Sequence, residues 1–239
     1  MNKLQFNRMA TTALFAVLVF VSSVALAQKP IKRPPKKVRQ TTTQQVAKPP
    51  KKTVAPAKPT RGEINGHYYV DLGLSVKWAT TNIGAGSPTD YGYYFAWGET
   101  LSKTEFNEED CVTMGLELPD ISGNEKYDAA RYDWGGSWRM PTYAEFKELL
   151  GNCMWEWTKR GDTNGMLVTG PNGNSIFLPA AGGSLSAEVE KLNQCGYYWS
   201  SSPYNNGHEA SAFMFSFDNE KKFGDCERGI GLPIRPVTK

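Results

Sequence analysis

The stretch from Gln28 to Arg61 constrains the fold more than any other part of the sequence, because it cannot contribute to a hydrophobic core. It contains eleven Lys and Arg residues but no acidic and no aromatic residue. Repulsion among these charges and the stiffness of its many Pro residues favour an extended, disordered linker. In polyproline II conformation the linker would reach on the order of 100 Å. The folded part of the chain is therefore limited to residues 62–239.

Residues 1–27 have the three parts of a secretory signal peptide. Two basic residues are followed by an apolar run over 9–24 and by Ala25-Leu-Ala27, the small-x-small pattern that signal peptidase cleaves. We expect cleavage before Gln28, export to the periplasm or the cell exterior, and no stable membrane span afterwards. An uncleaved membrane anchor is the alternative, because about twenty apolar residues can just span a bilayer.

The net charge of +3 hides an uneven distribution. The first 27 residues carry two positive charges and the linker carries eleven, which leaves −10 for residues 62–239. This acidic part also contains all seven Trp residues, and it is long enough for a single core. The basic linker suits contact with peptidoglycan or another anionic polymer, and a solvated spacer is the alternative. Nucleic acid is excluded as a partner because the linker lacks aromatic rings that stack on bases.

One helix is well specified, over residues 143–150. Thr142 is placed to cap its N-terminus, Glu145 is the reciprocal partner of a capping box, and Gly151 ends it. Phe146 and Leu149 share one face, so the helix should pack against a sheet.

Short β-rich segments separated by Gly-rich turns predict several strands. The predicted strands lie within 67–79, broken at Gly73, and at 91–97, 166–169, 175–178, 197–200, 212–217 and 231–237. Asn172-Gly173 predicts a hairpin between 166–169 and 175–178. Residues 98–133 are polar and predict a long surface excursion with a single helical turn at 128–131. The pattern indicates an α+β fold with mainly antiparallel sheet.

Five segments resemble the Fibrobacter succinogenes major paralogous domain. They are Gly66-His-Tyr-Tyr-Val-Asp-Leu-Gly-Leu-Ser-Val-Lys-Trp-Ala-Thr80, Tyr94-Phe-Ala-Trp-Gly-Glu99, Trp138-Arg-Met-Pro-Thr142, Gly170-Pro-Asn-Gly-Asn-Ser-Ile-Phe-Leu-Pro-Ala-Ala-Gly182 and Tyr198-Trp-Ser-Ser-Ser202. The family is abundant in exported proteins of gut Bacteroidetes. The resemblance implies that residues 62–239 adopt the C-type-lectin-like fold shared with the formylglycine-generating enzyme. It implies fold better than function, since most members have no assigned activity.

The four cysteines form an even set in an oxidising compartment, which predicts two disulfides with three possible connectivities. We pair Cys195 with Cys226, because each precedes an apolar segment, and this leaves Cys111 with Cys153. The family resemblance implies that a Cys at the position of Thr81 partners Cys153, with Cys111 as its substitute here. No C-x2-C pair occurs, so we expect no zinc site.

Neither catalysis nor calcium binding is expected, and therefore no cofactor. An enzyme similar to the formylglycine-generating oxidases needs two adjacent thiols, whereas only Cys226 lies in the corresponding region. That enzyme is the least favoured alternative. The Glu-Pro-Asn, Gln-Pro-Asp and Trp-Asn-Asp triplets of calcium-dependent lectins are missing as well.

Aromatic and amide side chains remain as ligand-binding candidates, because rings stack on sugar faces and amides bond to hydroxyls. The candidates are Trp134, Tyr197, Tyr204, Asn205 and Asn206. Trp134 and Tyr204 lie among turn residues and should be exposed. Four other tryptophans should fill the core, namely Trp78, Trp97, Trp138 and Trp199. Arg139 should pair with a carboxylate beneath the helix start.

These observations predict an exported, non-catalytic binding or adhesion module of the bacterial envelope. It would recognise a glycan or an envelope protein through loops of the lectin-like domain. The alternative is an envelope-structural protein whose basic linker contacts peptidoglycan or another anionic polymer.

Overall fold

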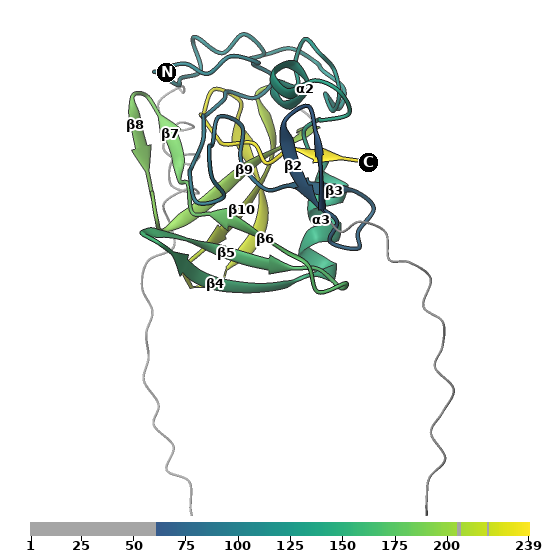
Figure 1. Cartoon of the computed structure of the whole chain (residues 1–239). Helices are drawn as coiled ribbons and strands as arrows, with labels where there is room; N and C mark the ends of the chain where they lie inside the picture. The colour runs from purple at the N-terminus through teal and green to yellow at the C-terminus, as the bar shows by residue number, and fades with distance from the viewer. Residues whose placement is uncertain (1–60, 205–206, 219) are drawn as a thin grey trace, which may run out of the picture. The chain divides into compact units, whose positions relative to one another are not determined.

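The structure, a computed structural model, describes residues 61–204, 207–218 and 220–239. The expected signal peptide, the linker up to residue 60, and the ligand candidates Asn205 and Asn206 lie outside these ranges. The described residues form short antiparallel strands in four sheets, together with two helices (Figure 1). This confirms the expected α+β class with mainly antiparallel sheet.

The four sheets contain twelve short strands among the described residues. The first sheet has the order β1-β2-β3-β12, with β1 Arg61–Ile64, β2 His67–Val70, β3 Lys77–Ala79 and β12 Val237–Thr238. The second has the order β4-β5-β6, with β4 Met154–Arg160, β5 Thr163–Thr169 and β6 Ser175–Pro179. The third has the order β11-β10-β9, with β9 Cys195–Pro203, β10 Glu209–Ser216 and β11 Lys221–Glu227. The fourth pairs β7 Gly183–Leu185 with β8 Glu188–Glu190.

Both helices begin at side-chain caps. Helix α3, Tyr143–Asn152, begins with the predicted capping box, in which Thr142 and Glu145 exchange hydrogen bonds with each other's backbone. Helix α2, Ala129–Trp134, replaces the predicted single turn and is capped by the Asp128 carboxylate. Such caps satisfy backbone N–H groups that the helix itself leaves unpaired.

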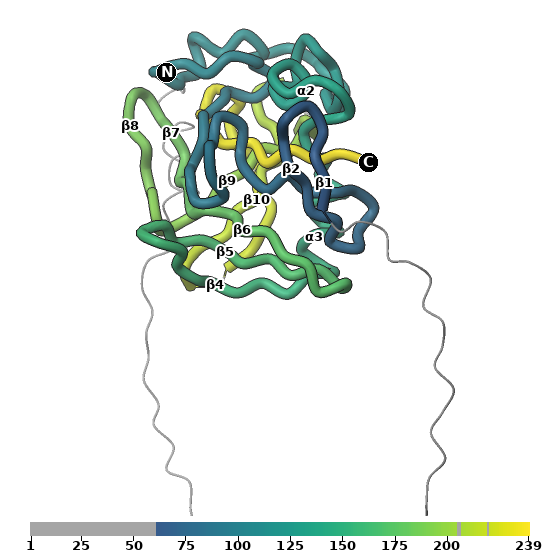
Figure 2. Tube along the Cα trace, in the orientation of Figure 1, coloured from purple at the N-terminus to yellow at the C-terminus, as the bar shows by residue number. Residues whose placement is uncertain are grey.

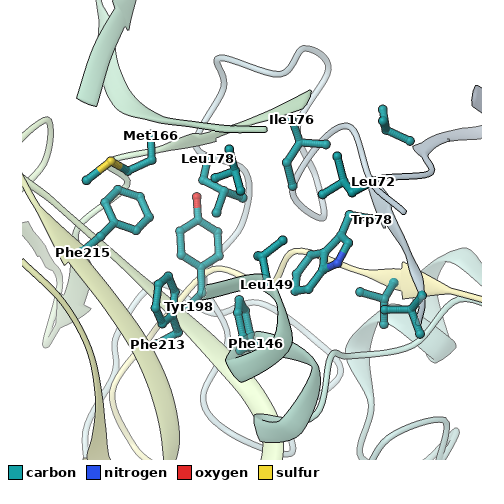
Figure 3. Packing of buried hydrophobic residues seen from close by; sticks show 14 of the residues in the cluster. Leu72, Trp78, Phe146, Leu149, Met166, Ile176, Leu178, Tyr198, Phe213 and Phe215 are labelled. Atoms are coloured by element: carbon teal, nitrogen blue, oxygen red, sulfur yellow. The ribbon is translucent and has the colours of Figure 1, made fainter. Parts of the chain in front are cut away.

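The main core lies between the sheet of β4–β6 and the sheet of β9–β11, beside the first sheet (Figure 3). Helix α3 contributes Phe146 and Leu149 to it, and Phe213 of β10 stacks on Phe146 with ring centroids 5.3 Å apart. The prediction that four tryptophans fill the core is confirmed, since none of them has any solvent exposure. They are Trp78, Trp97, Trp138 and Trp199.

Several predicted strands agree with the structure, and others differ from it. The segments at 67–70 and 77–79 pair as β2 and β3, and Asn172-Gly173 lies in the turn between β5 and β6. The segment 91–97 contributes only an isolated bridge, between Phe95 and Leu232. Strands β4 and β11 were not predicted, and each lies at the edge of its sheet.

The predicted disulfides are not formed, because all four cysteines are free. Cys195 lies opposite Ser216 of β10, whereas Cys226 lies opposite Ala210. Six residues of β10 separate these positions, roughly 20 Å at the usual strand rise, and a disulfide needs Cα atoms within about 7 Å.

The second predicted pair fails for a similar reason. Cys111 packs with Ala96 and Phe106 in a small separate cluster, while Cys153 packs against the main core beside the start of β4. The pairing of Cys195 with Cys226 and of Cys111 with Cys153 is therefore corrected to four free thiols.

No helix within the described ranges has both the length and the apolar character required to cross a bilayer.

Candidate functional site

The segment of residues 98–128, which makes up most of the excursion predicted at 98–133, covers one end of the domain. In Figures 1 and 2 it runs as a blue-to-teal coil beside α2, at the end opposite β4. It lies against the β9–β10 turn, because the Gly115 N–H donates to the Gly207 carbonyl at 2.9 Å. We call the surface formed by residues 98–120, Tyr204 and the adjoining ends of β10 and β11 the loop face.

A buried arginine holds the loop face in place from beneath. Arg228 is only 1% exposed, and its guanidinium lies 4.3 Å from the centre of the Trp97 ring. Its Nη1 donates to the carbonyls of Thr113 at 2.9 Å and Leu116 at 2.7 Å, and its Nε donates to the carbonyl of Glu209 at 3.2 Å. Arg228 thus joins the loop to β10, and its burial lowers its pKa below the ordinary arginine value.

Two carboxylates fix the far end of the excursion. Asp120 accepts hydrogen bonds from the hydroxyls of Ser201 at 2.7 Å and Ser202 at 2.6 Å. The buried carboxylate of Asp128 accepts four backbone N–H groups, including those of Gly123 and Met140, which lie on either side of α2. The excursion is therefore a preorganised loop, which lowers the entropy cost of binding a partner.

The loop face is strongly acidic. Residues 98–120 contain seven Asp and Glu against one Lys, so this segment carries −6 of the −10 in residues 62–239. Glu105, Glu109 and Glu117 are exposed and form no ion pair with any residue that the structure describes.

Three carboxylates come together where the loop meets the sheet. Glu209 and Glu227 lie directly opposite each other on β10 and β11, and the charge of Glu108 in the loop acts on Glu227. Burial and the charges of Glu108 and Glu209 raise the pKa of Glu227 above its ordinary value. The charges of Glu108 and Glu209 therefore oppose the ionisation of Glu227. His208 lies beside the group, with its Nδ1 3.8 Å from Glu108.

Apolar side chains are exposed on the same surface. Leu101, Val112 and Leu116 are 67%, 70% and 42% exposed, and Tyr204 is 47% exposed at the β9–β10 turn. The loop face thus combines hydrogen-bond acceptors and negative charge with apolar contact area. This combination suits a partner that carries ammonium or guanidinium groups beside apolar surface.

Only one described ligand candidate from the sequence lies exposed on this face. Tyr204 is exposed as predicted, whereas Trp134 is 5% exposed and Tyr197 is 4% exposed. The expectation of an exposed Trp134 is wrong, because its ring stacks on His67 of β2 at 3.8 Å and meets Trp138 edge-on. Tyr197 is likewise buried, within β9.

The prediction for Arg139 is confirmed. Its guanidinium donates to both carboxylate oxygens of Glu145, at 2.8 Å through Nη1 and at 2.5 Å through Nη2, beneath the start of α3. The loop-face carboxylates Glu108, Glu209 and Glu227 were not singled out from the sequence. In the sequence, only the acidic run Glu108-Glu-Asp110 points to this group of carboxylates. Glu209 and Glu227 are brought together by the pairing of β10 with β11, and β11 was not predicted.

Three of the four cysteines are poorly suited to thiolate chemistry. Burial raises the pKa of all three thiols for which a shift is resolved, to about 11 for Cys153 and also above the ordinary value for Cys195 and for Cys226. Within the described part of the chain, no three His, Cys, Asp or Glu side chains are grouped so as to hold a metal ion.

Comparisons of this chain with protein-family models, with curated proteins and with solved structures gave no match. The candidate site therefore depends on the chain's own geometry: a loop pinned by Arg228 that presents carboxylates and apolar side chains.

Proposed function

We propose that the chain is an exported, non-catalytic recognition module of the bacterial envelope, with a C-type-lectin-like domain that binds its partner through the loop face. The partner carries clustered positive charge, as a basic segment of an envelope protein or an amino-sugar glycan does. The observation that carries this proposal is the placement of Glu209 opposite Glu227 beside Glu108.

This arrangement supports a binding role because it gathers negative charge where a cationic partner can contact it. A cationic group near Glu227 would relieve its repulsion with Glu108 and Glu209, and the exposed carboxylates of Glu105, Glu109 and Glu117 would extend the contact. Arg228 keeps the loop in one conformation, so little ordering is needed when the partner binds.

Fluorescence anisotropy of the mature chain, residues 28–239, tests the proposal. The probes are labelled octa-lysine and chitosan oligosaccharides, with octa-glutamate and neutral cello-oligosaccharides as negative controls. We expect a cationic probe to bind, and its affinity to fall as salt increases.

The variant Glu108→Gln/Glu209→Gln/Glu227→Gln should weaken that binding at least tenfold. A matched control, Glu63→Gln/Glu156→Gln/Asp162→Asn, removes the same number of charges from outside the loop face and should leave binding within twofold. Equal losses in both variants would show general charge attraction and would refute the loop face as the site. Failure of both cationic probes to bind would refute the proposed partner class.

A second candidate function follows from the charge of the linker. Eleven positive charges without an acidic residue favour contact with peptidoglycan or another anionic polymer. Deleting residues 28–60 retains β1 and should abolish sedimentation of the protein with cell-wall sacculi. Unchanged sedimentation would contradict this role.

A further inference from the structure

Strand β4 has an open edge at the end of the domain opposite the loop face (Figure 1). All seven of its residues pair with β5 on one side. On the other side, β4 forms no backbone hydrogen bond with any described residue. An open edge of this length offers unpaired N–H and C=O groups to another strand.

Apolar side chains along this edge are incompletely covered. Trp155 and Trp157 are partly buried and lie over Phe213 and Phe215 of β10, with ring centroids 5.3 to 6.4 Å apart. Met154 at the start of β4 is 73% exposed. A further strand along β4 would cover these side chains as well as the backbone.

The charges along β4 indicate which strand fits. Glu156 and Arg160 point to the face opposite Trp155 and Trp157, because side chains alternate along a strand. Charged residues on an edge usually discourage pairing, unless the register brings opposite charges together.

Two antiparallel copies of β4 that continue one sheet must place residues of the same face opposite each other. If the twofold axis passes beside Glu156, each Glu156 carboxylate lies opposite the Glu156 carboxylate of the second copy. If the axis passes beside Trp157, each Glu156 lies opposite Thr158 of the second copy. A register centred on Thr158 places each Glu156 opposite Arg160 of the second copy, and each Trp157 opposite Lys159 of the second copy.

We propose that two copies of this chain associate through β4, in antiparallel register centred on Thr158. The pairing forms two Glu156–Arg160 ion pairs, brings two Lys159 ammonium groups beside Trp157 rings, and continues the β4–β6 sheet across a twofold axis. Both loop faces lie away from this interface, so the association does not depend on the proposed function.

Sedimentation equilibrium of the mature chain between 1 and 100 µM tests the proposal. We expect wild type to dimerise, and Glu156→Arg and Arg160→Glu each to raise the dimer dissociation constant at least tenfold. The double variant Glu156→Arg/Arg160→Glu restores opposite charges in the same register and should return to within threefold of wild type. Glu63→Arg, a charge reversal on β1, is the control and should dimerise like wild type.

Cross-linking provides a second readout of the register. Thr158→Cys faces its own equivalent across the axis and should form a disulfide-linked dimer under oxidation, whereas Glu156→Cys should not. A monomer at 100 µM would overturn the proposal. The proposal would also be overturned if the two single charge reversals dimerised as strongly as wild type. A double variant that unfolds thermally like wild type but does not regain the wild-type dimer dissociation constant would overturn it as well.

Discussion

Replacing Arg228 with Met should release the loop face and destabilise the domain by about 3 kcal/mol. The hydrogen bond to the Thr113 carbonyl is buried and contributes about 2 kcal/mol, while those to Leu116 and Glu209 are partly buried and contribute about 1 kcal/mol each. Loss of the guanidinium over the Trp97 ring costs about 1 kcal/mol. Burial of the introduced Met side chain stabilises the variant by about 2 kcal/mol, which leaves the net loss of about 3 kcal/mol.

Thermal unfolding and amide hydrogen exchange measure this effect. For a domain of this size, a loss of 3 kcal/mol lowers Tm by about 9 °C. The Gly115 amide, which bonds to Gly207, should also exchange faster than in wild type.

Arg131→Met is the control for Arg228→Met. It removes an ion pair with the largely exposed Glu125 and should cost less than about 1 kcal/mol. An unchanged Tm together with unchanged exchange at Gly115 would refute the view that Arg228 anchors the loop.

Three further substitutions test the charges of the domain. Because the pKa of Glu227 is raised in the folded state, its ionisation opposes folding, and wild type should lose stability as pH rises through this titration. In urea unfolding at pH 7, Glu227→Gln should therefore be about 0.5 kcal/mol more stable than wild type. Glu145 behaves in the opposite way. Burial raises its pKa, but hydrogen bonds from Arg139 and Thr142 outweigh this effect, so the pKa is lowered overall. Glu145 therefore stabilises the fold at neutral pH, and this contribution is lost as pH falls through the lowered pKa. Glu145→Gln should cost about 1.5 kcal/mol at pH 7, and its unfolding curve should converge with that of wild type in acid; a constant difference would contradict this assignment. Arg235→Met leaves three buried acceptors without their donor and should cost about 3 kcal/mol in the same assay, whereas a cost below about 1 kcal/mol would show that the acceptors find other donors.

Local sequence signals predicted the elements that are specified by neighbouring residues. The capping box of Thr142 and Glu145 fixed the start of α3, and Asn172-Gly173 fixed the β5–β6 turn. In these cases the partners are only a few residues apart, so the geometry follows from spacing alone.

Edge strands were harder to predict, because one side of an edge strand faces solvent. Strand β4 mixes Trp155 and Trp157 with Glu, Thr, Lys and Arg, and β11 contains Gly224 and Asp225. Neither segment has the continuous β-forming character that identified the buried strand β9.

Long-range contacts determined the remaining differences. Trp134 precedes the turn at Gly135-Gly136, which suggested exposure, yet His67, which stacks on it, comes from a hairpin far earlier in the chain. The pairing of Cys195 with Cys226 failed because the β9–β10–β11 register, which sets their separation, cannot be read from the residues next to each Cys.

The two proposed surfaces make a joint prediction about binding strength. A dimer formed through β4 presents two loop faces, so a long polycation that reaches both binds with an avidity gain of about 100-fold or more over a short one. At a concentration where wild type is dimeric and Glu156→Arg, with its raised dimer dissociation constant, is monomeric, this variant should bind long poly-lysine more weakly by about that factor and octa-lysine equally well. The double variant Glu156→Arg/Arg160→Glu should bind long poly-lysine as tightly as wild type. Anisotropy measured below the dimer dissociation constant provides the control, because wild type and variant should then bind poly-lysine equally. If Glu156→Arg lowers the affinity for octa-lysine as much as the affinity for poly-lysine, β4 acts on the loop face directly and the avidity argument fails.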